Sequence, residues 1–156
     1  MLFIQLLRIQ RSITARLVLC VFSVLFTPAL WAAPLHDAAE MGDLSRITTL
    51  VAAGANIAEI DSRGIWPLLA AVTDGNLEVI ALLLTLKADP NQHDQYRYSA
   101  LHEAASLGYY DVVELLINAK ANINLRDIND ITPLGYAMRS SSVDTVTLLQ
   151  SKGAME

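Results

Sequence analysis

Apolar positions recur along this chain with a fixed spacing of 33 residues. The first of them form a column of leucines, namely Leu35, Leu68, Leu101 and Leu134, with no insertion or deletion between them. Within each interval, apolar residues also return every three or four positions, as in Leu77, Ile80 and Leu84. The long spacing is typical of a repeat protein, and the short one is typical of amphipathic helices. The pattern therefore predicts a stack of similar helical units.

Each unit contains two short predicted helices joined by a tight turn. The first helix of each unit is expected to run for about eight residues and to end at a residue without Cβ, because a left-handed helix end favours glycine. These terminal residues are Gly42, Gly75 and Gly108, with Ser141 in the last unit. A single pair of this size cannot bury its apolar face, so we expect neighbouring pairs to stack.

Polar side chains mark the expected helix starts. Ser99 and Thr132 precede the first helices of the last two units, and Pro67 and Pro133 suit a first helical position, as Pro34 would. Side-chain oxygens before the second helices can accept from their first backbone N–H groups. The predicted caps there are Asp43, Asn76 and Ser142.

The run from Ser99 to Asn124 closely resembles the ankyrin repeat pattern, T-P-L-H-x-A-A followed by a turn, V-V-x-L-L-L and G-A-x-x-N. The resemblance covers residues 34–154. It implies an all-α solenoid of four helix-turn-helix units, with β-turn fingers between them and a concave surface on the finger side. Asp61, Asp94 and Asp127 stand where such fingers open. The implied repeats are about 33–60, 61–93, 94–126 and 127–156.

Several positions depart from the family pattern. Trp66 replaces a threonine, Leu69 and Gly135 replace histidines, and Lys87 and Lys120 replace a turn glycine. These changes are expected to loosen individual turns without altering the stack. The last unit carries polar residues on its second helix, as a repeat that covers an exposed end does. They are Thr145, Thr147 and Gln150.

Residues 1–32 lie outside the repeat. They contain Arg8, Arg11 and Arg16, no acidic residue, and then an apolar run that ends in small residues. This order is typical of a secretory signal peptide, with cleavage expected after Ala32. The alternative is a retained membrane anchor, because the apolar run approaches the roughly 20 residues that span a bilayer. Residues 33–156 then form the ankyrin repeat domain.

The net charge of the chain excludes some classes of binding partner. The whole chain has a formal net charge of −5, and removing three of its 11 basic residues leaves eight against 16 acidic ones, or −8. A chain this acidic, with no clustered Lys/Arg stripe, is not expected to bind nucleic acid or anionic lipid. Its one cysteine, Cys20, lies in the apolar run, so the predicted mature chain has no thiol for a disulfide or thiolate metal site.

The sequence contains no pattern that points to chemistry. His36 and His102 occupy the T-P-L-H position, whose expected role is hydrogen bonding between neighbouring turns, and His93 lies in a solvated loop beside Asp94. No nucleophile elbow, phosphate-binding loop or paired-histidine zinc motif is present. We expect no catalytic residue, no metal site, no cofactor and no small-molecule substrate.

Aromatic residues indicate a binding surface. By resemblance, Tyr96 and Tyr98 fall on the second finger, and exposed tyrosine, isoleucine and arginine together suit a protein interface. Tyr110 is expected to lie in the core. The candidate protein-binding residues are Arg63, Ile65, Asp74, Tyr96, Tyr98, Leu107, Asn129, Ile131 and Arg139.

These features predict an exported, non-catalytic binding protein that acts as a monomer. A signal peptide before a small cysteine-free repeat domain resembles the periplasmic ankyrin proteins of Gram-negative bacteria, so the expected location is the periplasm or the exterior. The alternative is an accessory subunit anchored in the inner membrane, which supports or protects an envelope enzyme or assembly. The partner itself cannot be inferred, because a repeat fold does not determine what it binds.

Overall fold

The computed structural model of the protein describes residues 29–155. Over that range the chain forms eight α-helices, and its strand pairing is a single bridge between His93 and Ser99. The helices are α2 (Ala29–Glu40), α3 (Leu44–Ala52), α4 (Pro67–Thr73), α5 (Leu77–Thr85), α6 (Ala100–Leu107), α7 (Tyr110–Asn118), α8 (Pro133–Arg139) and α9 (Val143–Ser151). The predicted all-α repeat architecture is confirmed.

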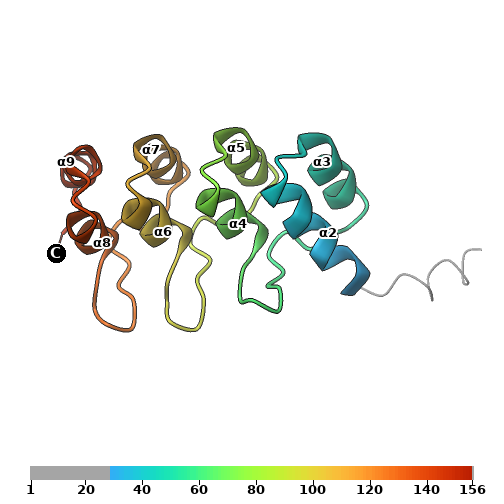
Figure 1. Ribbon diagram of the computed structural model, residues 1–156, viewed down its shortest axis with the longest axis horizontal. Helices are drawn as coiled ribbons and strands as arrows, with labels where there is room; N and C mark the ends of the chain where they lie inside the picture. Colours follow the sequence, from blue (N-terminus) through green and yellow to red (C-terminus); the bar gives the residue numbers. More distant parts are fainter. Residues whose placement is uncertain (1–28, 156) are drawn as a thin grey trace, which may run out of the picture.

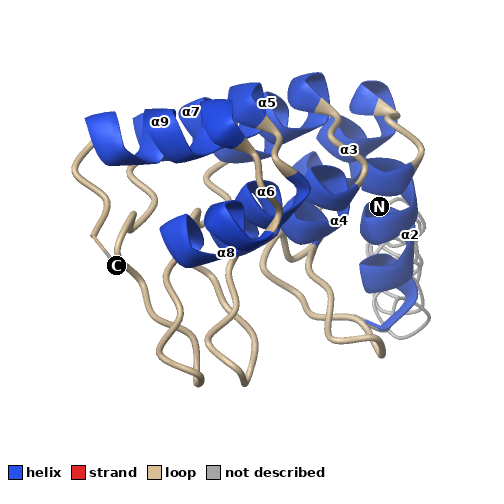
Figure 2. Ribbon diagram, turned by 60° about the vertical axis from the view of Figure 1, so that its left-hand side comes forward, coloured by secondary structure: helices blue, strands red, loops and turns tan. Residues whose placement is uncertain are grey.

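The helices lie in two layers (Figure 1). An inner layer contains α2, α4, α6 and α8, and an outer layer contains α3, α5, α7 and α9. A tight turn joins each inner helix to its outer partner, and a longer loop leads on to the next inner helix. These loops contain finger 1 (residues 61–66), finger 2 (94–99) and finger 3 (127–132), which project from the same side of the stack (Figure 2).

The core lies between the two layers. The leucine column, which lies in the inner helices, is at most 2% exposed. The outer helices pack Ile47, Ile80, Val113 and Leu149 against it, and all four are fully buried. Each such side chain contributes about 1.5–3 kcal/mol to the stability of the fold by leaving water. The apolar residues that recur in every repeat therefore stabilise the stack.

Most of the predicted helix caps and turn residues are found in the structure. Gly42, Gly75 and Gly108 have positive φ, and the side chains of Asp43 and Asn76 accept from the backbone N–H three residues on, at 2.9 and 3.1 Å. The predicted Ser142 cap is wrong. Its hydroxyl lies 3.0 Å from the Ser140 hydroxyl instead of capping α9, because both serines lie in the same turn.

The first inner helix is longer than predicted. α2 has 12 residues and begins at Ala29, so Pro34 lies inside the helix rather than at its start. The alanines and leucine before Pro34 are strong helix formers and offset the backbone hydrogen bond that proline removes. Cleavage after Ala32 would leave eight helical residues, the length of α6. Residues 1–28, with most of the predicted signal peptide, lie outside the described residues, and no described helix is long and apolar enough to cross a bilayer.

Two side chains differ in burial from the sequence prediction. Tyr110, predicted in the core, is 41% exposed, because it begins α7 at the rim of the stack while Tyr109 packs against the core. Thr145, predicted on the exposed end, is 1% exposed because it faces inward from α9. Its hydroxyl has no hydrogen-bond partner among the described residues. Thr147 and Gln150 lie on the exposed side as expected.

Candidate interaction surface

The three fingers are built by one repeated device. In each, an aspartate carboxylate accepts from the backbone N–H groups two and four residues later, which closes the turn. The distances are 2.8 and 2.9 Å for Asp61, 2.8 and 2.8 Å for Asp94, and 2.9 and 2.9 Å for Asp127. The aspartates thus open the fingers as the resemblance implied. These hydrogen bonds fix the backbone of each finger turn.

Hydrogen bonds also determine the pKa of two of these carboxyls. Burial would raise the pKa of Asp127, but the Ile131 N–H and the hydroxyl of Tyr136, at 2.8 Å, lower it below its usual value. Burial acts in the same direction on Asp61, and the N–H of Ile65 with the Arg63 side chain outweighs it, so that pKa is also lowered. Both carboxyls therefore stay ionised and hold their turns at neutral pH.

The contact between fingers 2 and 3 differs from that between fingers 1 and 2. The backbone N–H of Ile128 in finger 3 donates to the carbonyl of Tyr96 in finger 2 at 3.0 Å. Between fingers 1 and 2 lies instead an open groove of about 470 Å³. It is lined by Ile60, Asp61, Ser62, Arg63, Gly64, Asp94, Gln95 and Tyr96. The structure thus brings two predicted site residues, Arg63 and Tyr96, to the walls of one groove.

Arg63 is held in position on its wall of the groove. Its Nη2 donates to Glu40 of α2 at 2.5 Å, and its Nε donates to Asp61 at 2.7 Å. These carboxylates raise the pKa of the guanidinium, with the Glu40 bond as the largest cause. Half of the Arg63 side chain remains exposed, so it can still bind a partner.

Tyr98 has a different role from Tyr96. Tyr96 is 53% exposed at the finger tip, whereas Tyr98 is half-buried and donates from its hydroxyl to Glu103 at 2.8 Å. Burial, followed by the bond to Glu103, raises the pKa of Tyr98. Its ring stacks on His102 at 5.3 Å and meets the edge of Tyr136 at 5.3 Å. Tyr98 therefore anchors finger 2 to the inner helices.

The histidines at the T-P-L-H position tie one unit to the next. His36 Nε2 bonds to the Ile65 carbonyl at 2.9 Å, and His102 Nε2 donates to the Ile131 carbonyl at 3.3 Å. The second nitrogen of His102 accepts from the Ser99 backbone, so the neutral ring caps α6 as well. Burial lowers the pKa of His102. The predicted structural role of both histidines is confirmed, while His93 lies exposed in its loop.

The remaining predicted residues do not share one patch. Ile65 and Ile131 are half-buried at the finger bases, and Asn129 packs on Asp127 through a 3.3 Å bond. Arg139 lies 5.9 Å above the Tyr136 ring. Asp74 and Leu107 end the inner helices α4 and α6, away from the fingers.

Sequence reasoning missed two polar members of the inner surface. Glu103 and Tyr136 stand 33 residues apart on α6 and α8, and each bonds to a finger residue, Tyr98 or Asp127. Their shared repeat position was the available signal. That signal was weak, because the same repeat position holds Asp37 and Ala70 in the first two units and so does not keep one type of side chain.

Between residues 29 and 155, no group of three or more His, Cys, Asp or Glu side chains could hold a metal ion. The arrangement instead offers an exposed tyrosine, a positioned arginine and a groove between two rigid fingers. Such a surface can recognise a partner by shape and hydrogen bonding.

Comparison with known proteins agrees with this architecture. A sequence model described as ankyrin repeats, in three copies, matches residues 35–127, which is more than half of the chain. The fourth helix pair, α8 and α9, follows the matched segment. A search of curated proteins returns no match to the chain.

Proposed function

The chain belongs to the ankyrin repeat family, and we propose that it is a non-catalytic binding protein, exported from the cytoplasm, that holds one protein partner against its concave finger surface. Repeats of this family generally mediate protein–protein interaction. That general role is the premise, and the choice of surface and of compartment is the proposal.

The groove between fingers 1 and 2 is the observation that carries the choice of surface. Ile60 and Tyr96 are 50% and 53% exposed there, and Arg63 lines the same groove with its guanidinium already oriented by two carboxylates. Aromatic and arginine side chains in a depression are the residues that most often dominate binding energy. Because the aspartate bonds fix the finger turns, a partner meets them with little loss of conformational entropy.

A crosslinking pulldown from the source cells tests the surface. Tyr96→Ala and Arg63→Ala are expected to reduce partner recovery at least about tenfold, since hot-spot residues contribute 2 kcal/mol or more. Arg46→Ala is the matched control for Arg63→Ala, because it removes another exposed arginine, on the outer helix α3. Equal recovery with wild type and Tyr96→Ala would refute the finger surface.

Export is supported by the three arginines, the apolar run and the small residues up to Ala32. The proposed compartment is the periplasm or the exterior of a bacterium. The length of α2 agrees with cleavage at that bond, because removing residues 29–32 makes it as long as α6.

Cell fractionation with intact mass measurement tests export. The expected result is a soluble extracytoplasmic protein whose mass begins at Ala33. A full-length chain beginning at Met1 in the membrane fraction would replace this proposal with the anchored accessory subunit, and a full-length cytosolic chain would exclude both.

A further inference from the structure

We propose that the protein has a second docking surface, at the ends of the helices away from the fingers, and that it binds a basic amphipathic helix of a partner protein. The turn-end surface consists of Asp74, Leu107, Tyr110, Asp111, Val143 and Asp144. It surrounds the tight turns that join inner to outer helices in the second, third and fourth units. This proposal is independent of the finger surface.

Large apolar side chains gather there and remain partly exposed to solvent. Leu107 is 42% exposed, Tyr110 41% and Val143 74%. Tyr110 and Val143 stand 33 residues apart and begin consecutive outer helices, so the repeat places them in one row. Single exposed apolar residues are ordinary on a protein surface, but an aligned row of them marks an interaction site.

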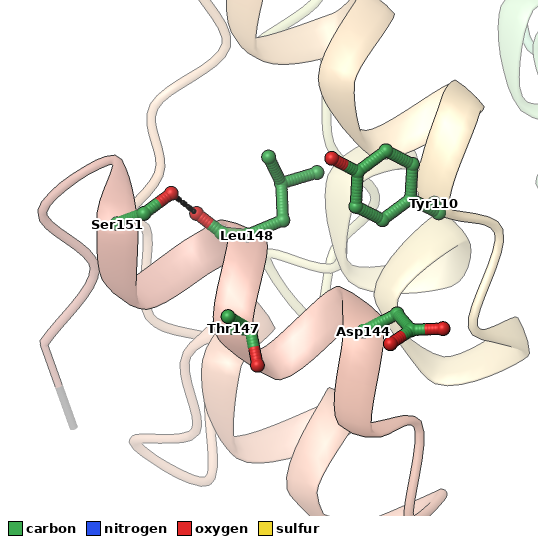
Figure 3. A pocket seen from close by; sticks show the side chains of 5 residues that line it. All are labelled: Tyr110, Asp144, Thr147, Leu148 and Ser151. Atoms are coloured by element: carbon green, nitrogen blue, oxygen red, sulfur yellow. Dashed lines mark hydrogen bonds between the residues drawn. The ribbon is translucent and has the colours of Figure 1, made fainter.

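Hollows flank Tyr110 on both sides. One, of about 270 Å³, lies toward α5 and is lined by Asp74, Leu77 and Asp111 among others. The other, of about 450 Å³, lies between α7 and α9, and Figure 3 shows Tyr110 facing Leu148 across it. Apolar side chains of a partner can therefore enter on either side of the tyrosine ring, which is the geometry of an anchor between two pockets.

Acidic residues define the charge of the partner. Asp111 and Asp144 occupy the same position in successive outer helices, and Asp74 lies beside the first hollow. All three are exposed, and none forms an ion pair with a described residue. Lys or Arg side chains on a partner would therefore gain new attraction, which also speeds association.

The repeat spacing determines the shape of the partner. Packed helices lie about 8–10 Å apart, so equivalent residues of successive units recur at that distance. Residues seven apart on a helix lie on one face and about 10.5 Å apart, at 1.5 Å per residue. An amphipathic helix with apolar residues at heptad spacing therefore meets successive units in register, with basic residues beside the carboxylates.

The same charges disfavour other occupants. A second copy would bring its own Asp111 and Asp144 against these carboxylates, since a two-fold contact uses the same patch on both subunits. Anionic lipid would be repelled for the same reason. A basic protein helix is the occupant that both the apolar row and the carboxylates attract.

Fluorescence anisotropy with a labelled 15-residue peptide tests the proposal. The probe contains leucine on a heptad face and lysine elsewhere, and a matched probe carries glutamate in place of every lysine. We expect the lysine probe to bind wild-type protein with a Kd below about 1 mM and to weaken as salt rises, and the glutamate probe not to bind. Tyr110→Ala, and separately Asp111→Asn with Asp144→Asn, should raise the Kd at least about tenfold.

Tyr96→Ala is the matched control and should leave the Kd of the lysine probe unchanged. Circular dichroism checks that each variant is folded, and the double asparagine variant decides the question if Tyr110→Ala is not. The proposal is overturned if the lysine probe fails to bind wild type, if both probes bind equally, or if Tyr96→Ala weakens binding as much as Tyr110→Ala. The pulldown tests the finger surface through Tyr96→Ala and Arg63→Ala, and the anisotropy experiment tests the turn-end surface through Tyr110→Ala, so failure of one proposal is distinguishable from failure of the other.

Discussion

Left-handed backbone at residues other than glycine is a source of local strain in the described part of this chain. Five such residues occur in the described range, namely Lys87, Arg97, Lys120, Asp130 and Ser141. Gly54 and Gly153 hold the position of Lys87 and Lys120 in the first and last units, at φ 97° and 90°. A side chain in this conformation costs about 1–2 kcal/mol, because Cβ approaches the following carbonyl. The surrounding stack imposes the turn regardless of the residue.

Exchanging residues at this repeat position should therefore change stability in opposite directions. Lys87→Gly relieves the strain at φ 73° and is expected to raise the free energy of unfolding by about 0.5–1 kcal/mol, the gain being reduced by the greater freedom of glycine in the unfolded chain. Gly54→Ala should lower it by about 1 kcal/mol, although a Cβ there meets no atom within 4 Å. Urea denaturation measures both. A loss of stability in Lys87→Gly would contradict the strain argument.

Thr145 carries a buried hydroxyl without a partner among the described residues. Thr145→Val keeps the branched shape and removes that group, so it should raise the free energy of unfolding by about 1 kcal/mol, as judged by urea denaturation. Val112 already occupies the same repeat position in the third unit. Thr147→Val on the exposed side of α9 is the control and should change stability by less than about 0.5 kcal/mol. Equal effects of the two substitutions would show that burial is not the cause.

Between elements, asparagine side chains connect the loops that follow the outer helices. Asn91 accepts from the Asn122 N–H at 2.6 Å and donates to the Lys120 carbonyl at 3.2 Å. Asn124 repeats the pattern with Met155 and Gly153, at 2.8 and 3.5 Å. The first unit has Ala58 at this position, where Gln92 donates to the Ala58 carbonyl instead. The loops of the first two units therefore share fewer hydrogen bonds.

Ala58→Asn should complete the series. By the spacing of Asn91, the new side chain would accept from the Asp89 N–H and donate to the Lys87 carbonyl. Two added hydrogen bonds predict a gain of about 1–2 kcal/mol in the free energy of unfolding and slower hydrogen exchange at the Asp89 amide. Asn91→Ala, which removes the existing pair, should lower stability by a similar amount. No change in exchange at Asp89 would mean that the bonds do not form.

At the scale of the whole molecule, acid should weaken the stack through groups that bind fewer protons when folded. The pKa of His102 is lowered by burial, so below the unfolded value of about 6.5 the unfolded chain takes up more protons and stability falls. The lowered pKa values of Asp61 and Asp127 act in the same direction below about pH 4, since unfolded aspartate titrates near 3.9.

The slope of stability against pH tests the histidine contribution. Between about pH 7 and pH 5, the free energy of unfolding should decrease in the wild type and change less in His102→Gln, whose side chain does not titrate. An unchanged slope in His102→Gln would assign the pH dependence to other groups.

The 33-residue period and the turn residues predicted four stacked helix pairs from the sequence, and the resemblance to ankyrin repeats added the three fingers and the aspartates that open them. That succeeded because every one of these features depends on residues close together in the chain. The three-to-four residue spacing also predicted which side of the outer helices faces the core, as the fully buried Ile80 and Leu83 of α5 show.

Only the tertiary structure decided how far each surface position is covered. Tyr98 and Tyr96 stand two residues apart on one finger, yet one packs on His102 and the other faces solvent. Tyr110 is exposed although it was predicted in the core, and Thr145 is buried although it was predicted on the exposed end. Exposure at the rim of a stack depends on how neighbouring units pack against each other. The groove beside Arg63 also exists only between units, since its two walls lie about one repeat apart in the sequence.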